Sequence, residues 1–263
     1  MGALLVLRGA ARIGRTGTIE WNSPPMLAVQ LIVIPFSQIS FFFLLGQSAG
    51  YTGSSLDYIV LGNAVQPITT ASVFAVASLV TRDKYQGTLV GIVLCPANRL
   101  ALFVGRSLFQ IVVSLLIVSV GILMAATLFG IPLGNANYAG LILSLSLTAV
   151  SMVGFGLLVS SVGLYLRTVT NLSNVLLFLT VLVCGVNFPV SQLPSWLRPV
   201  SYAIPLTYGL SAVRNAIQGA PVASILPLLL KEVAVGLGLV AGAYGVLTSF
   251  ERVLRRTGRF DVL

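Results

Sequence analysis

Long apolar stretches separated by short polar breaks dominate the pattern of this chain. A helix needs about 20 apolar residues to cross the hydrocarbon core of a bilayer. The uncharged run from 107 to 166 is long enough for two such helices, with a turn at the Pro-, Gly- and Asn-rich residues 130–138. The whole pattern predicts six membrane-spanning helices, at residues 26–46, 58–80, 100–129, 138–164, 171–188 and 231–250.

Basic residues are distributed unevenly over the breaks between these stretches. With six spans both chain ends lie on one side, and loops rich in Lys and Arg stay in the cytoplasm. Placing the ends inside leaves three of the fifteen Lys and Arg on the outer face, namely Arg198, Arg214 and Lys231. We therefore expect an N-in/C-in topology, with residues 251–263 as a basic cytoplasmic tail.

Two segments depart from the spanning pattern. In residues 1–22, Arg8, Arg12 and Arg15 share one helical face and apolar side chains the other. This favours an amphipathic helix against the lipids of the inner leaflet, with a disordered tail carrying a topology signal as the alternative. Residues 189–214 are apolar, but frequent prolines prevent a straight helix. We expect a re-entrant outer hairpin buried against the protein, rather than an ordinary external loop.

Composition supports an all-α integral membrane protein with one transmembrane domain over residues 1–263. Apolar residues make up 57% of the chain and charged residues 8%, and the mean hydropathy is +1.00. Soluble domains carry about 25% charged residues. The net charge of +9 is then explained by topology, so no nucleic-acid partner is expected. The expected location is multi-pass in a cell membrane, and the lack of paired cysteines fits a bacterial cytoplasmic membrane.

The chain lacks the residues that would power or catalyse a reaction. It has no His, its two Cys have no metal-binding spacing, and no G-x-x-x-x-G-K-[ST] motif for phosphate occurs. No cofactor, metal or catalytic site is therefore expected in this chain, and it is not predicted to be an enzyme. Ionisable residues inside spans mark ion paths. None is expected at mid-span, because Asp57, Lys231 and Glu232 fall at predicted span ends.

Neutral side chains inside two spans are candidates for a translocation path for an amphipathic or lipid-like solute. They repeat at helical spacing along one face of each span. The alternative for any one of them is hydrogen bonding and packing between helices, which is commoner. The candidates are Gln66, Thr70 and Phe74 in the second span, and Asn174, Phe178 and Val181 in the fifth.

A charged island, "RDKYQGTLVGIVLCPANR", occupies residues 82–99 between the second and third spans. Leu89, Ile92 and Val93 give it one apolar helical face, and Pro96 ends the helix. The pattern predicts a cytoplasmic helix that a partner contacts. A loop that only sets topology would need the basic residues but not the apolar face.

The order of these elements and two motifs resemble the permease subunits of ABC-2 type exporters, most closely the drug- and antibiotic-resistance branch. "TRDKYQGTLVGIVLCPANRLALFVGRSL" is similar to the cytoplasmic segment of that family, where a charged cluster precedes Gly-Thr-Leu, a proline and a basic residue. "FPVSQLPSWLRPVSYAIPLTYGLSAVR" is similar to its outer segment. The family often has Glu-Arg-Glu-type charges where this chain has Arg82, Asp83 and Lys84.

The resemblance implies that ATP is hydrolysed by other chains and not by this one. Two permease chains, identical or paired with a sister, would associate with two ABC ATPase subunits that bind ATP and Mg. The implied ATPase-coupling residues are Arg82, Asp83, Lys84, Gly87, Thr88, Leu89, Pro96 and Arg99. The matching residues of the outer hairpin are Pro189, Pro194, Trp196, Leu197, Pro205, Tyr208 and Arg214.

The same resemblance implies export of an amphipathic drug- or antibiotic-like solute from the cytoplasm or inner leaflet. An exporter of lipid or lipid-linked polysaccharide is the first alternative. An ion-coupled secondary carrier and a non-transporting membrane anchor are the others.

Changes in the charged island should separate ATP hydrolysis from transport. Replacing Gly87 with a bulky residue, or reversing Arg82 and Lys84 to Glu, should leave the chain folded while transport falls, because the helix can no longer pass on the ATPase motion. ATP hydrolysis and transport would be measured in the same vesicles. Expression and orientation are checked alongside, because charge reversal also acts on topology. Normal transport by these variants would refute the coupling assignment.

Overall fold

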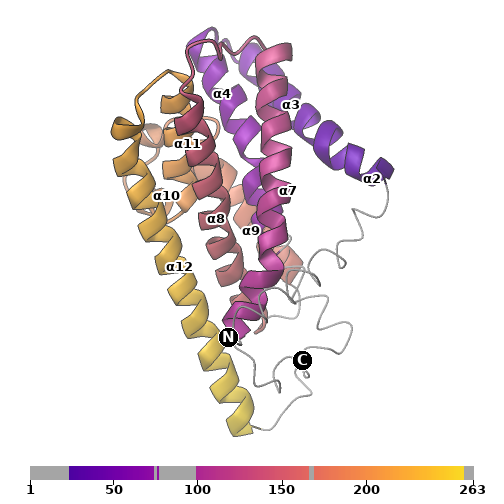
Figure 1. The fold of residues 1–263 in the computed structure, drawn as a ribbon, viewed down its shortest axis with the longest axis vertical. Coiled ribbons are helices and arrows are strands. Elements are labelled where there is room, and N and C mark those ends of the chain that lie inside the picture. The colour runs from indigo at the N-terminus through magenta and orange to yellow at the C-terminus, as the bar shows by residue number, and fades with distance from the viewer. Residues whose placement is uncertain (1–23, 74–75, 77–98, 166–168, 258–263) are drawn as a thin grey trace.

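The computed structural model describes residues 24–73, 76, 99–165 and 169–257. These residues form helices and short connections without any β-strand, so the all-α expectation is confirmed (Figure 1). The predicted amphipathic segment 1–22, the charged island except Arg99, and the end of the basic tail lie outside the described residues.

Four helices within the described part are long and apolar enough to cross a membrane. They are Val29–Ser48, Gly105–Leu128, Tyr138–Gly163 and Val222–Phe250. The first combines a π-helical turn, η2 (Val29–Val33), with α3 (Ile34–Ser48), and α2 (Pro24–Ala28) precedes it. The second and third lie in α7 (Arg99–Leu128) and α8 (Tyr138–Gly163). These three match the predicted spans 26–46, 100–129 and 138–164.

The other two predicted interior spans are shorter or broken in the structure. The predicted span 58–80 is represented by α4 (Ser54–Val65), a turn at Gln66, and a further helical stretch from residue 67 to 73. Pro67 has no N–H to continue the helical hydrogen bonds, which accounts for the break. The predicted span 171–188 is represented by α9 (Val169–Val183), whose 15 residues are fewer than a straight crossing needs. The count of six spans therefore stays a prediction.

The last helix begins earlier in the chain than the predicted span 231–250. α12 runs from Val222 to Thr257 and contains Pro227 in its interior. The apolar run that could cross a membrane therefore begins at Val222, nine residues before Lys231. Glu232 lies inside this helix and is fully buried, whereas the sequence placed it at the end of a span. The sequence placed Lys231 at the same span end, whereas the helix continues through both charged residues.

Helix α8 organises the packing of the second half of the chain. α12 runs parallel to α8, because Gly140 lies against Ile225 near one end and the ring of Tyr165 lies 5.0 Å from that of Phe250 near the other. α11 (Pro205–Ile217) runs antiparallel to α8 and packs against both α8 and α12, which also contact each other directly. Since α8 and α12 are parallel, residues 164–221 must carry the chain back along the length of α8, which α9 and α11 do together (Figure 1).

Asn137 fixes the start of α8 against the end of α11. Its side chain accepts a hydrogen bond from the Gly140 N–H at 3.1 Å, as a helix N-cap does, and donates to the carbonyl of Ala220 at 3.0 Å. Its backbone N–H donates to the carbonyl of Ala216 at 2.8 Å. The α7–α8 and α11–α12 connections therefore lie at one end of the bundle, and Figure 1 shows the α3–α4 connection at the same end.

Two glycines of α12 provide a matched test of this packing. A Cβ on Gly236 would lie 3.0 Å from side-chain atoms of Ser151 in α8, whereas a Cβ on Gly238 meets nothing within 4 Å. Gly236→Leu should therefore lower the free energy of unfolding by about 1–3 kcal/mol, the usual cost of overpacking. Gly238→Leu should leave it unchanged or raise it, because Leu favours helix more than Gly does. Thermal unfolding of both variants in detergent would test the parallel arrangement, and equal stabilities would contradict it.

Candidate functional site: the outer hairpin and the polar interior

Arg214 joins three parts of the chain at one buried point. This arginine of α11 is 8% exposed. Its guanidinium donates to the carbonyls of Gly185 at 2.9 Å, Val186 at 3.0 Å and Tyr58 at 2.9 Å, and lies 3.3 Å from the centre of the Tyr58 ring. The stacking on Tyr58 is a cation–π contact. Arg214 thus fixes α11 to α4 and to the turn after α9.

The chain around Arg214 is shaped to bring these carbonyls together. Gly185 adopts a φ of +75°, a left-handed conformation that Gly accepts without strain, and it ends α9. Gly62 of α4 packs so closely that a Cβ there would overlap the carbonyl of Val186. Any side chain at Gly62 would consequently push α4 away from the turn and from Arg214.

The predicted outer hairpin, residues 189–214, divides into an exposed half and a buried half. The exposed half contains a short 3₁₀ turn, η3 (Val190–Gln192), and α10 (Arg198–Tyr202), and the buried half is α11. The expected burial of this segment against the rest of the protein is therefore found for α11. Whether the hairpin re-enters a bilayer stays a prediction. Among the predicted hairpin residues, Pro194 and Trp196 are exposed, Pro189, Leu197 and Tyr208 are partly buried, and Pro205 and Arg214 are buried.

A chain of amide side chains links α3, α4 and the turn after α9. Gln38 donates to Gln66 at 2.8 Å, and Asn63 donates to Asn187 at 2.8 Å. Gln38 also approaches the Asn63 oxygen at 3.4 Å. Asn63 is fully buried and Gln66 nearly so, so these amides act as hydrogen bonds between helices. The sequence reading singled out Gln66 but missed its partners, which no spacing rule connects.

The other path candidates lie apart from this chain of amides. Thr70 is partly buried on the continuation of α4, and Phe74 lies outside the described residues. On α9, Asn174 and Phe178 are exposed, with 77% of Phe178 accessible, and Val181 is partly buried. A role of these residues in translocation stays a prediction.

The residues predicted to couple to an ATPase are almost all outside the described part. Arg82, Asp83, Lys84, Gly87, Thr88, Leu89 and Pro96 fall there, and Arg99 is the first residue of α7. Figure 1 places the start of α7 at the same end of the bundle as the end of α12, and the connection from α11 to α12 lies at the opposite end.

Glu232 places an acidic side chain in the centre of the packed helices. It is fully buried, and the hydroxyl of Thr148 is a polar group that interacts with its carboxyl. It faces Gly209 of α11 and the hydroxyl of Thr148 of α8, since a Cβ on Gly209 would meet both side chains. An acid inside an apolar helix is costly and is rarely kept without a role.

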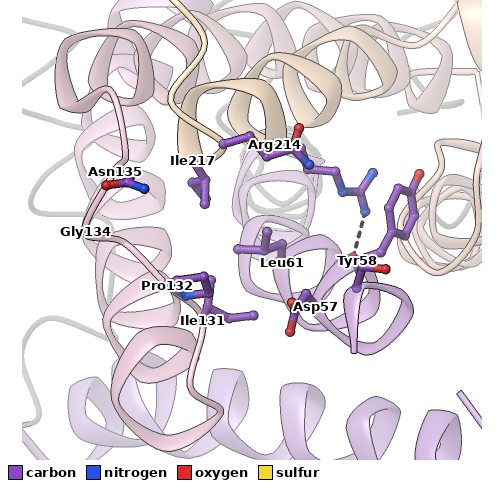
Figure 2. Close-up of a pocket in the computed structure, with 11 residues that line it drawn as sticks. Asp57, Tyr58, Leu61, Ile131, Pro132, Gly134, Asn135, Arg214 and Ile217 are labelled. Carbon is purple, nitrogen blue, oxygen red and sulfur yellow. Dashed lines mark hydrogen bonds between the residues drawn. The ribbon is translucent and has the colours of Figure 1, made fainter. Parts of the chain in front are cut away.

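A cavity of about 390 Å³ opens at the end of the bundle where α4 begins, α7 connects to α8, and α11 ends. Figure 2 shows Asp57 of α4 facing Ile131 and Pro132 of the α7–α8 connection across this space. Partial burial raises the pKa of the Asp57 carboxyl above its usual range. No ion pair or side-chain hydrogen bond is found for Asp57 among the described residues. The sequence reading treated Asp57 only as the end of a span.

Comparison with known proteins gives a family match over most of the chain. The family described as ABC-2 type transporter matches residues 18–217. The chain is 27% identical over 157 residues to the probable multidrug ABC transporter permease YbhR of Escherichia coli strain K12, and equally to YbhR of Escherichia coli O157:H7. The match covers 59% of this chain and 42% of YbhR. The matched part of the chain thus spans about two fifths of the length of these curated relatives.

Two arginines of the hairpin offer a matched test of the buried junction. Arg214→Lys keeps the charge but loses the fork of donors and the stacking on Tyr58. Because hydrogen bonds to a buried charge are strong, we expect a loss of about 2–4 kcal/mol in the free energy of unfolding. Arg198 also donates to two backbone carbonyls, those of Leu193 and Ser191, but is exposed. Arg198→Lys should therefore cost less than about 1 kcal/mol. Chemical denaturation in detergent measures both, and equal losses would contradict the junction.

Proposed function

This chain belongs to the ABC-2 type transporter family, and on that basis we propose that it is the membrane-spanning permease subunit of an ATP-driven exporter. The observation that carries the proposal is the extent of the family match. Residues 18–217 include both the charged island 82–99 and the outer hairpin 189–214. The apolar helices of the described part agree with a location in a membrane.

The energy source in this proposal is a separate ABC ATPase. Pairing with such a subunit follows from the family, and the chain itself has no G-x-x-x-x-G-K-[ST] motif for ATP. We propose two ATPase copies, each binding ATP and Mg, and a second permease chain that is identical or a sister. ATP binding closes the ATPase pair, the charged island passes the motion to the spans, and a path between the permeases opens outward.

The proposed substrate is an amphipathic drug- or antibiotic-like solute. Two observations support this class: the relative named as a probable multidrug permease, and the exposed aromatic and amide side chains on one face of α9. A lipid or a lipid-linked polysaccharide is the alternative substrate. It would be transported through the same membrane helices and driven by the same ATPase.

Among the described residues, the buried Glu232 favours an ion-coupled carrier instead. Buried acids inside spans serve as proton sites in such carriers. A proton path needs further ionisable groups or water leading to the acid, and neither the cavity at Asp57 nor an apolar groove beside α7 includes Glu232 among its lining residues. We therefore keep the ATP-driven exporter as the proposed function.

A transport assay separates these two mechanisms. The tagged chain is purified from its native host, its co-purifying ATPase is identified by its Walker motif, and both are placed in vesicles with the ATPase outside. We expect uptake of an amphipathic dye with ATP, and loss of uptake when the Walker lysine of the ATPase is replaced by Ala. The same vesicles without the ATPase, given a pH gradient, should take up no dye. Uptake driven by the gradient alone would refute the proposal.

A further inference from the structure

We propose that the cavity at Asp57 binds the ammonium group of an amphipathic molecule, with Asp57 as the counter-charge. That the bound molecule is also exported rests on the proposed function. The binding itself is inferred from the size of the cavity, from the residues that line it, and from which of its charged groups is already paired.

The cavity has the size and the lining of a small-molecule site. Its volume of about 390 Å³ falls within the range of about 300–1,000 Å³ that is typical of ligand pockets. Leu61, Ile131 and Ile217 give it an apolar wall, and all three are buried. The exposed residues Ser54, Asn135 and Gln218 surround the opening and supply polar groups there. An apolar body with one polar end suits this arrangement.

The two charged residues of the cavity differ in what they can offer a ligand. The guanidinium of Arg214 already donates to three carbonyls and lies over the ring of Tyr58. Figure 2 shows it turned toward Tyr58 rather than toward Asp57. Asp57, in contrast, is partly removed from water, and no ion pair or side-chain hydrogen bond engages its carboxylate within the described part of the chain. The unpaired carboxylate of Asp57 therefore favours a cationic ligand.

An ammonium group fits Asp57 better than a bare metal ion. Metal ions such as Ca²⁺ need about six to eight oxygen ligands, and no group of three or more His, Cys, Asp or Glu that could hold a metal is found among the described residues. A single carboxylate beside an apolar wall is instead suited to a charge-assisted hydrogen bond from an amine whose carbon skeleton covers Leu61 and Ile131. The ammonium could belong to a free amphipathic solute or to a phosphatidylethanolamine headgroup.

The test uses rhodamine 6G, which is a cation on an apolar ring system. Fluorescein, an anion on a similar ring system, is the matched probe. Binding to the purified full chain in uncharged dodecyl maltoside micelles is followed by fluorescence anisotropy, without ATP or ATPase. Failure of this assay leaves the exporter proposal standing, and failure of ATP-driven transport leaves the binding result standing.

We expect rhodamine 6G to bind and fluorescein not to bind. Asp57→Asn should weaken the binding of rhodamine 6G about five- to tenfold, the scale of one charge-assisted contact at a partly exposed site. Asp57→Glu should retain most of the affinity. Glu251→Gln makes the same change in net charge toward the far end of α12 and should leave the affinity unchanged. Raising the salt concentration should weaken binding to the native chain more than binding to Asp57→Asn.

A second variant keeps the test decisive if Asp57→Asn does not fold. A Cβ on Gly134, which lines the cavity, meets nothing within 4 Å, so Gly134→Trp can be accommodated and should reduce binding by narrowing the cavity. Equal affinity of the native chain, Asp57→Asn and Gly134→Trp for rhodamine 6G would overturn the proposal. Added phosphatidylethanolamine that displaces the dye, where phosphatidylglycerol does not, identifies the lipid headgroup as the source of the ammonium. No displacement by either identifies a free solute.

Discussion

A buried backbone carbonyl has no water to pair with, and the guanidinium of Arg214 meets that constraint where the chain leaves α9. After α9 ends at Gly185, the carbonyls of Gly185 and Val186 have left the helical pattern. Arg214 donates to both, and to the carbonyl of Tyr58 in α4. An irregular turn can lie inside a helical protein only if its polar groups are paired in this way. The position of α11 follows from this contact.

The placement of α11 determines what surrounds it. Once α11 lies along α8, its end meets Asn137 and its Gly209 lies against Thr148 and Glu232. The helix therefore separates two different environments. On one side lie the closely packed glycines between α8 and α12, and on the other lies the cavity at Asp57. A change at Arg214 would be felt in both, because one rigid helix connects them.

The same contact gives the cavity its electrostatic character. Arg214 lines the cavity but directs its donors to backbone carbonyls and its planar face to Tyr58. Asp57 is left as the charged group with free acceptors, beside apolar side chains from two other parts of the chain. An arginine that had paired with Asp57 would have produced a neutral, closed site. Here the guanidinium of Arg214 donates to the backbone carbonyls of Gly185 and Tyr58 and is therefore not paired with Asp57.

The sequence by itself determined the helical class, the approximate position of four apolar helices and the family motifs. These depend on local runs of about 20 apolar residues and on proline placement, which a linear reading detects. It began the last span at Lys231, because a charged pair is expected at a span end, whereas α12 begins at Val222 and packs on α8 along its length. Only the tertiary structure decided that Gln66 pairs with Gln38, that Arg214 is buried over Tyr58, and that Asp57 faces Ile131. Each of these contacts joins residues far apart in the chain, and their geometry depends on how closely the helices approach each other.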